Sequence, residues 1–152
     1  MINTLRHSSI YDPARYAAKR VALIGVGTIG SHLALTLARM QVPFTMYDPD
    51  TIEEHNLATQ AYTRRDLGRY KVEAIQAVCE AIGAVDGSIW ARSTAYRATD
   101  TAQDLIVSCV DSIDARRDIA RSLGENNTPI IDGRVGAEQV EVHRYPSAAD
   151  WL

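Results

Sequence analysis

The fold of this 152-residue chain is decided by Val21-Ala-Leu-Ile-Gly-Val-Gly-Thr-Ile-Gly30. The first residues of this stretch are apolar without alternation, which is typical of a strand buried on both faces of a parallel sheet. Glycines then punctuate the sequence, and apolar residues recur at helical spacing as far as Met40. The stretch therefore predicts a buried strand, a glycine loop and an amphipathic helix over residues 28–40.

The glycine loop has the form of a nucleotide-binding turn. Gly25 permits a tight turn, Gly27 lets a phosphate approach the backbone, and Gly30 lets the helix pack against the sheet. Thr28 begins the helix, whose free N–H groups and partial positive charge attract an anion. Asp48 follows the next predicted strand, 23 residues after Gly25, where a carboxylate accepts hydrogen bonds from ribose hydroxyls. The pattern predicts an adenine-nucleotide site but does not separate NAD from ATP.

The rest of the chain alternates apolar strands with amphipathic helices. Residues 1–19 are expected to form an irregular leader with room for one helical turn, and residues 51–65 an ordered loop. Further strands are expected at residues 42–47, 88–96, 105–110, 129–131 and 140–143, and further helices at residues 71–82 and 112–123. This order predicts an α/β, Rossmann-like domain over residues 20–152, with a doubly wound, mostly parallel sheet and helices on both faces.

Composition excludes several classes of protein. The chain is 46% hydrophobic and 23% charged, which is typical of a folded domain. Its 16 basic residues are interspersed among 19 acidic ones, for a net charge of -3, so no basic surface for nucleic acid is expected. No apolar run approaches the roughly 18 residues of a membrane span, and the first 20 residues lack the apolar core of a secretory signal. We therefore expect a cytoplasmic protein without a membrane partner.

Three motifs and one later aspartate help to decide between NAD and ATP. An Asp-x-Asp pattern follows the second predicted strand, then an Asn-Leu-x-x-Gln pattern, then an Asp-x-Gly-x-x-Lys pattern at the start of a helix. Here these motifs are Asp48-Pro-Asp50, Asn56-Leu-Ala-Thr-Gln60 and Asp66-Leu-Gly-Arg-Tyr-Lys71, and Asp111 follows an apolar strand with Arg116 five residues later. In this order and spacing, the residues resemble the ThiF/MoeB/HesA relatives of the ubiquitin-activating enzymes.

This resemblance extends from about Arg6 to Tyr145 and implies an ATP-dependent adenylyltransferase. Such an enzyme joins a carboxylate to AMP and releases pyrophosphate. The resemblance implies that Lys71 contacts the phosphates and that Asp111 holds Mg²⁺. It implies a nucleotide site completed by Asp48 at the ribose, Asn56 near the phosphates, Asp50 and Gln60. The implied substrate is the C-terminal glycine of a ubiquitin-like or sulfur-carrier protein, and the implied assembly is a homodimer or pseudo-dimer.

Thr59 departs from the family pattern, which most often has an arginine there that meets the phosphates. We expect Arg134 to replace it, because the Asp-Gly-Arg motif at residues 132–134 follows a predicted strand at the carboxyl edge of the sheet. In this motif the sequence resembles a subgroup of the family, often found in phage and mobile elements, that carries a similar Asp-Gly-Arg. Arg64 and Arg65 are the other candidates, and the structural alternative for Arg134 is a surface pair with Glu138.

The resemblance also implies an arginine contributed by the N-terminal segment of a partner subunit. Arg6 is the nearest match and Arg15 is the reserve. Many relatives transfer the acyl group to a cysteine, but Cys79 and Cys109 are expected to be small core residues. Neither belongs to a CxxC pair, which argues against a zinc site. Either the chain is a fragment of a longer protein, as its end without a predicted helix also suggests, or its chemistry stops at adenylation.

Ordinary structural roles remain open for the same residues. A lysine at a helix start is usually solvated, and Asp111 is well placed to cap the helix over residues 112–123. An NAD-dependent oxidoreductase would share the glycine loop, but it gives no reason for Asn56, Lys71 and Asp111 together. Thr59 and the lack of an acceptor cysteine favour a third hypothesis, a non-catalytic partner subunit or scaffold with the same fold.

Overall fold

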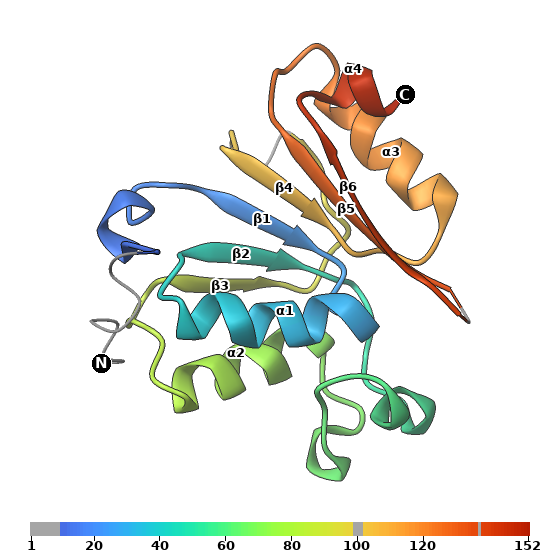
Figure 1. Cartoon of the computed structure of the whole chain (residues 1–152). Coiled ribbons are helices and arrows are strands. Elements are labelled where there is room, and N and C mark those ends of the chain that lie inside the picture. The colour runs from blue at the N-terminus through green and yellow to red at the C-terminus, as the bar shows by residue number, and fades with distance from the viewer. Residues whose placement is uncertain (1–9, 99–101, 137) are drawn as a thin grey trace.

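The computed structural model describes residues 10–98, 102–136 and 138–152, whose strands form a six-stranded sheet between two layers of helices (Figure 1). The strand order is β3-β2-β1-β4-β5-β6, and each neighbouring pair is parallel except β5 with β6. The strands are β1 (Val21–Ile24), β2 (Phe44–Tyr47), β3 (Ile89–Arg92), β4 (Leu105–Ser108), β5 (Ile130–Val135) and β6 (Val140–Tyr145). The predicted Rossmann-like α/β fold is confirmed.

Helices cover the two faces of the sheet because successive residues of a strand point to opposite sides. In β1, Val21 and Leu23 pack in the core beneath α1 (Thr28–Arg39) and α2 (Lys71–Ala81). Ala22 and Ile24 pack in the opposite core, beneath α3 (Ile113–Leu123) and α4 (Ala148–Trp151). The unalternating apolar run in β1 is therefore explained by burial on both faces. Among the described residues, no helix has the length and apolar character needed to cross a membrane.

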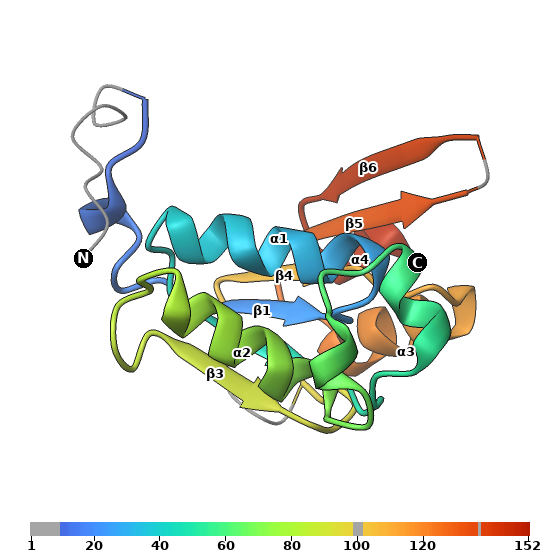
Figure 2. The ribbon, with the colours of Figure 1, turned by 90° about the horizontal axis from the view of Figure 1, so that it is seen from below.

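Several boundaries differ from those expected from the sequence. β3 ends at Arg92 rather than near residue 96, and β5 continues to Val135 rather than ending at residue 131. The extension of β5 follows from its antiparallel pairing with β6, which runs from Ile130 opposite Tyr145 to Val135 opposite Val140. This hairpin reaches past the carboxyl ends of the parallel strands (Figure 2).

The connecting segments contain short helical turns. The expected ordered loop contains the 3-10 turns η3 (Glu54–Ala58) and η4 (Arg64–Asp66), and the leader contains η2 (Pro13–Arg15). A closing helix was not expected, yet α4 forms near the end of the chain, where the Ser147 hydroxyl accepts the N–H of Asp150. The serine cap supplies a partner for one of the N–H groups that a helix start leaves unsatisfied.

Candidate functional site

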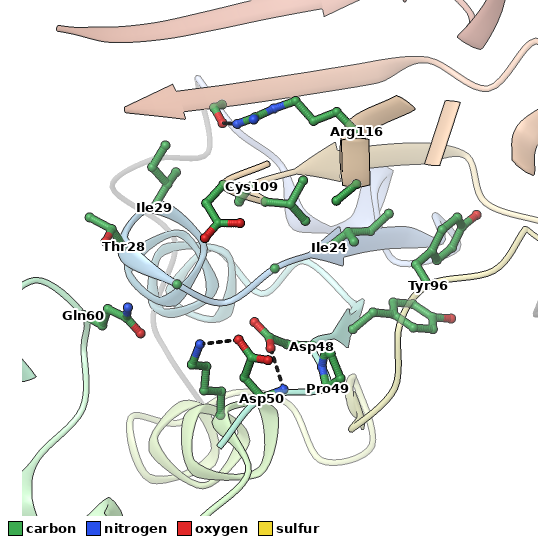
Figure 3. Close-up of a pocket in the computed structure, with 18 of the residues that line it drawn as sticks. Ile24, Thr28, Ile29, Asp48, Pro49, Asp50, Gln60, Tyr96, Cys109 and Arg116 are labelled. Carbon is green, nitrogen blue, oxygen red and sulfur yellow. Dashed lines mark hydrogen bonds and ion pairs between the residues drawn. The ribbon is translucent and has the colours of Figure 1, made fainter. Parts of the chain in front are cut away.

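A cavity of about 700 Å³ lies at the carboxyl end of the sheet, around the point where the strand order reverses between β1 and β4 (Figure 3). Open α/β sheets bind ligands at this switch point, and small-molecule sites usually occupy about 300–1,000 Å³. Most of the predicted site residues line the cavity: Gly25, Gly27, Thr28, Asp48, Asp50, Asn56, Gln60, Lys71, Asp111 and Arg134. Gly30 lies outside its lining, and Arg6 lies outside the described residues.

The three glycines of the loop have different structural reasons. Gly25 has φ +83°, and a Cβ there would lie 2.9 Å from the carbonyl oxygen of Cys109. A Cβ on Gly30 would collide with the carbonyl oxygen of Gly25, so Gly30 permits α1 to pack closely on the loop. A Cβ on Gly27 would meet only the Gln60 amide, at 3.9 Å. Packing thus explains Gly25 and Gly30, whereas the space at Gly27 opens toward the cavity.

Two hydrogen bonds to the backbone of Val26 fix the glycine loop in place. The Val26 N–H donates to Asp48 Oδ2 at 2.8 Å, and its carbonyl accepts the Tyr62 hydroxyl at 2.6 Å. Asp48 Oδ1 also accepts the Asp50 N–H at 2.9 Å. Burial raises the pKa of Asp48, although these two backbone hydrogen bonds oppose the rise. Asp48 therefore shapes the loop, and sequence reasoning missed Tyr62, which lies 36 residues from its acceptor.

Lys71 begins α2 and is buried at 7% exposure, so the solvated alternative for this lysine is wrong. Its Nζ donates to Asp50 Oδ2 at 2.8 Å, as the dashed line in Figure 3 marks. Its backbone N–H donates to the Asp50 carbonyl at 3.0 Å. The Asp50 side chain is 63% exposed, so the ion pair joins a buried ammonium to a solvated carboxylate at the cavity edge. The ammonium is thereby kept beside the space that the glycine loop encloses.

The segment after β2 places polar side chains on the same cavity. Asn56 is buried, and its Oδ1 accepts the Glu53 N–H at 2.9 Å, which closes the capping box of η3. Gln60 Oε1 is buried without a hydrogen-bond partner among the described residues. The Thr59 and Thr28 hydroxyls lie 3.1 Å apart. Thr59, at the family's arginine position, is therefore tied to the start of α1.

Asp111 lies between β4 and α3 and is exposed to the cavity. The α3 N-cap is Ser112, whose hydroxyl accepts the Ala115 N–H at 3.0 Å. The capping alternative for Asp111 is therefore wrong. Within the described parts of the chain, no hydrogen bond or ion pair engages its carboxylate. Asp111 is thus free to bind a cation.

Arg134 lies within β5 rather than after a strand, and its side chain is one-third exposed. Its Nε and Nη2 donate to Asp132 Oδ2 at 2.9 and 2.8 Å, so the expected alternative pair with Glu138 is wrong. Arg116, from α3, donates through Nε to Asp132 Oδ1 at 2.9 Å. Sequence reasoning missed this fully buried aspartate, although it quoted the motif that contains it.

Both cysteines are core residues, as predicted. Burial raises the pKa of Cys79 to about 11 and the pKa of Cys109 to about 12, with the nearby Asp132 charge adding to the second rise. Both thiols therefore stay protonated at neutral pH, and a protonated thiol is a poor nucleophile. Neither is prepared to accept an acyl group, although Cys109 lines the cavity.

Side chains of both charges line the cavity. Among the described residues, three cationic side chains line it, those of Lys71, Arg116 and Arg134. Four carboxylates also line it, those of Asp48, Asp50, Asp111 and Asp118. The lining thus has no excess of positive charge, and a highly charged anion would need an additional cation.

The sequence matches the model of the ThiF family over residues 12–143. Ubiquitin-like modifier-activating enzyme 5 of Drosophila mojavensis is 26% identical over 158 residues, which cover 91% of this chain and 39% of that protein. The ATP-dependent ubiquitin transferase-like protein Cap2 of Vibrio cholerae serotype O1 is 37% identical over 75 residues. Those residues cover 46% of this chain and 13% of that protein.

Solved structures have a similar fold. E. coli MccB, crystallised with AMPCPP and MccA, superposes with a TM-score of 0.78 at 19% identity, over 89% of this chain and 43% of MccB. The MccB structure with succinimide gives a TM-score of 0.77 at 21% identity. The chain therefore spans about two fifths of the length of MccB and of the Drosophila relative. Because the family model matches most of its length, this chain belongs to the ThiF family.

Proposed function

We propose that this domain binds ATP with Mg²⁺ and adenylates a carboxylate, releasing pyrophosphate. The observation on which this proposal rests is that one cavity is lined by the open Gly27 backbone, the Lys71 ammonium, the Arg134 guanidinium and an Asp111 carboxylate that no described residue pairs with. A phosphate chain needs backbone N–H groups and cations at one place, and a divalent metal needs a free carboxylate beside them.

The residues fit ATP in shape and in hydrogen bonding. Gly27 leaves room for a phosphate at the start of α1, where unsatisfied N–H groups and the helix dipole favour an anion. The buried Gln60 Oε1 lacks a partner, which a ligand N–H or hydroxyl would supply. Asp48 uses one lone pair of each oxygen within the protein and retains acceptor capacity for a ribose hydroxyl.

The residues also fit Mg²⁺. The carboxylates around the cavity outnumber its cationic side chains, so ATP without a metal would meet net repulsion. Asp111 would hold the ion, because no described residue pairs with its carboxylate and Mg²⁺ prefers carboxylate and phosphate oxygens. When bound, Mg²⁺ would supply neutralisation of phosphate charge.

In the proposed reaction, a substrate carboxylate oxygen forms a bond to the α-phosphorus of ATP while the bond from that phosphorus to the bridging oxygen breaks. The electron pair of that bond leaves with pyrophosphate. Lys71 is proposed to stabilise the negative charge that develops, after exchanging Asp50 for a phosphate oxygen. Arg134, from β5, is proposed to do the same. It would replace the arginine that the family usually has at the position of Thr59. Positioning and charge stabilisation together suit this transfer, which requires no acid or base.

The proposed substrate is the C-terminal glycine of a ubiquitin-like or sulfur-carrier protein. Support comes from relatives whose names refer to ubiquitin-like modifiers, and from MccB, which was crystallised with MccA. We further propose a homodimer or pseudo-dimer in which Arg6 of one subunit reaches the site of the other. Both proposals concern a whole protein of which this chain spans a part.

A second candidate is a non-catalytic partner subunit with the same fold. Two observations favour it: the Thr59 hydroxyl is tied to Thr28 where a phosphate-binding arginine is usual, and both thiols are protonated core residues. Such a subunit would bind nucleotide weakly or not at all, and it would not exchange pyrophosphate.

Pyrophosphate exchange into ATP tests the proposal. The purified protein is incubated with ATP, Mg²⁺, labelled pyrophosphate and synthetic peptides that end in glycine, with amidated peptides as the control that lacks a carboxylate. Labelled ATP should form only with the free carboxylates. Calorimetric titration with ATP and Mg²⁺, and separately with NADH, complements the assay. If none of the peptides supports exchange, and the protein binds NADH tightly but does not bind ATP, the proposal is overturned.

A further inference from the structure

A fully buried carboxylate joins three structural elements beside the cavity. Asp132, in the middle of β5, is 0% exposed. Its Oδ1 accepts Arg116 Nε at 2.9 Å, from α3. Its Oδ2 accepts Arg134 Nε at 2.9 Å, Arg134 Nη2 at 2.8 Å, and the indole Nε1 of Trp151, from α4, at 3.1 Å. Hydrogen bonds thus join Arg116, Asp132 and Trp151, which come from three different elements, into one cluster.

This carboxylate is closed to a ligand by its burial and by its four hydrogen bonds. Its Oδ2 accepts three N–H groups and its Oδ1 accepts one, and at 0% exposure neither oxygen is accessible to a ligand. Burial alone would raise the pKa of Asp132, but the hydrogen bonds from Arg116, Trp151 and Arg134 hold it below its ordinary value. Asp132 is therefore ionised at neutral pH, and it acts on its neighbours rather than on a substrate.

The two arginines that it holds differ in what they have left to offer. Arg116 is buried, and besides Asp132 it donates through Nη2 to the Gly133 carbonyl at 3.2 Å. Arg134 is one-third exposed and lines the cavity. A guanidinium has five N–H groups, and Arg134 uses one from Nε and one from Nη2 at Asp132, so no described residue occupies its remaining donors. The cluster of two arginines and one carboxylate also keeps one net positive charge.

The strand geometry explains how Asp132 aims Arg134. Residues two apart in a strand share a face, so the carboxylate lies beside the arginine that it binds. Both donors on one edge of the planar guanidinium meet this fixed carboxylate, which restrains a side chain that would otherwise lose considerable conformational entropy on binding. Arg116, from α3, and Trp151, from α4, hold the carboxylate itself.

We infer that Asp132 is a positioning residue that orients the Arg134 guanidinium toward the phosphates of ATP. This inference rests on the proposed function. It gives a physical reason for the pair Asp132 and Arg134: the guanidinium that Thr59 cannot supply is provided from another strand and is held in place by a buried carboxylate and the residues that anchor it.

A double-mutant cycle tests the inference through the dissociation constant of the ATP analogue AMPCPP with Mg²⁺, measured by calorimetry. The variants are Asp132→Asn, Arg134→Ala and the double variant. Asn keeps the size of the side chain, but it removes the charge and replaces one acceptor oxygen with a donor. Each single variant should weaken AMPCPP binding about 10-fold or more, as expected for a lost hydrogen bond to a charged group. The double variant should bind no more weakly than Arg134→Ala alone.

A purely structural role for Asp132 predicts a different result. The two losses would then multiply in the double variant, or Asp132→Asn would lower the melting temperature with AMPCPP affinity unchanged, and either outcome overturns the inference. If Asp132→Asn does not fold, Trp151→Phe takes its place in the cycle, because it removes only the indole donor and keeps an aromatic ring beside Tyr145. It should weaken binding in the presence of Arg134 and have no effect in its absence.

The same titration separates this inference from the proposed function. Wild-type protein that does not bind AMPCPP with Mg²⁺ would overturn both. Wild-type protein that binds it, with losses that multiply in the cycle, would overturn the positioning role of Asp132 and leave the proposed function standing.

Discussion

Replacing Lys71 with methionine should separate catalysis from stability. The chain has two lysines, Lys71 and Lys19. Methionine keeps most of the buried aliphatic stem of Lys71 and removes its charge, so the packing beneath the cavity is preserved. Alanine would be a poorer choice, because each buried methylene lost costs about 0.8 kcal/mol.

The structure sets the size of the two effects. The Lys71 side chain is 9% exposed, but its partner Asp50 is 63% exposed and stays hydrated when the ammonium is removed. The lost ion pair should therefore cost less than about 1 kcal/mol of unfolding free energy, which lowers the melting temperature by no more than about 4 °C in a chain of this size. Losing a cation that faces the developing phosphate charge should cost about 3–4 kcal/mol, a fall of about 10²–10³ in rate.

Pyrophosphate exchange and thermal unfolding, measured on the same preparation, report these two quantities. Lys19→Met is the matched control, because Lys19 is 54% exposed and pairs with Asp104 rather than lining the cavity. It should leave the exchange rate unchanged. An exchange rate for Lys71→Met within twofold of wild type would refute the assignment of this ammonium to the phosphates.

Three further predictions test other parts of the site. Asp111→Asn should weaken Mg²⁺-dependent ATP binding about tenfold with little change in stability. Ser112→Ala should instead cost about 1 kcal/mol of unfolding free energy and leave ATP affinity unchanged. If Asp111→Asn lowers stability and leaves ATP affinity unchanged, Asp111 is structural. Gly27→Ala should fold normally and lose ATP affinity, because its methyl group meets no backbone, while Gly30→Ala should fail to fold; equal melting temperatures would contradict this contrast. The pKa of Asp132 is lower in the folded protein than its unfolded value of about 3.9. Its contribution to stability is therefore present above the unfolded pKa and is lost as the pH falls through the folded pKa. Urea unfolding between pH 2 and 6 should accordingly show less acid destabilisation in Asp132→Asn than in wild type.

Local patterns made the fold and the glycine loop predictable. Burial on both faces leaves an apolar run in β1, and the turn into α1 requires glycine at two places for reasons of backbone conformation and packing. These requirements act over a few residues, so the sequence expresses them directly. The ThiF family match agrees with the resemblance inferred from the motifs. The roles assigned to the site residues stay predictions until ligand binding is measured.

Contacts between distant segments could not be predicted. The burial of Lys71 depends on the path of the loop from β2, and the cap of α3 depends on a choice between the adjacent Asp111 and Ser112. The cluster around Asp132 requires α3, β5 and α4 to meet, and nothing in the spacing of its residues specifies this meeting. β5 is longer than its apolar run because hydrogen bonds to β6 extend it. Such features follow from tertiary structure rather than from local propensity.

A crystal structure of the protein with AMPCPP and Mg²⁺ would show directly where the nucleotide binds. We expect the triphosphate in the cavity above Gly27, with phosphate oxygens within hydrogen-bonding distance of Lys71 Nζ and the Arg134 guanidinium, and with the metal bound by the Asp111 carboxylate. A nucleotide bound outside this cavity, or a triphosphate that contacts neither Lys71 nor Arg134, would contradict this expectation.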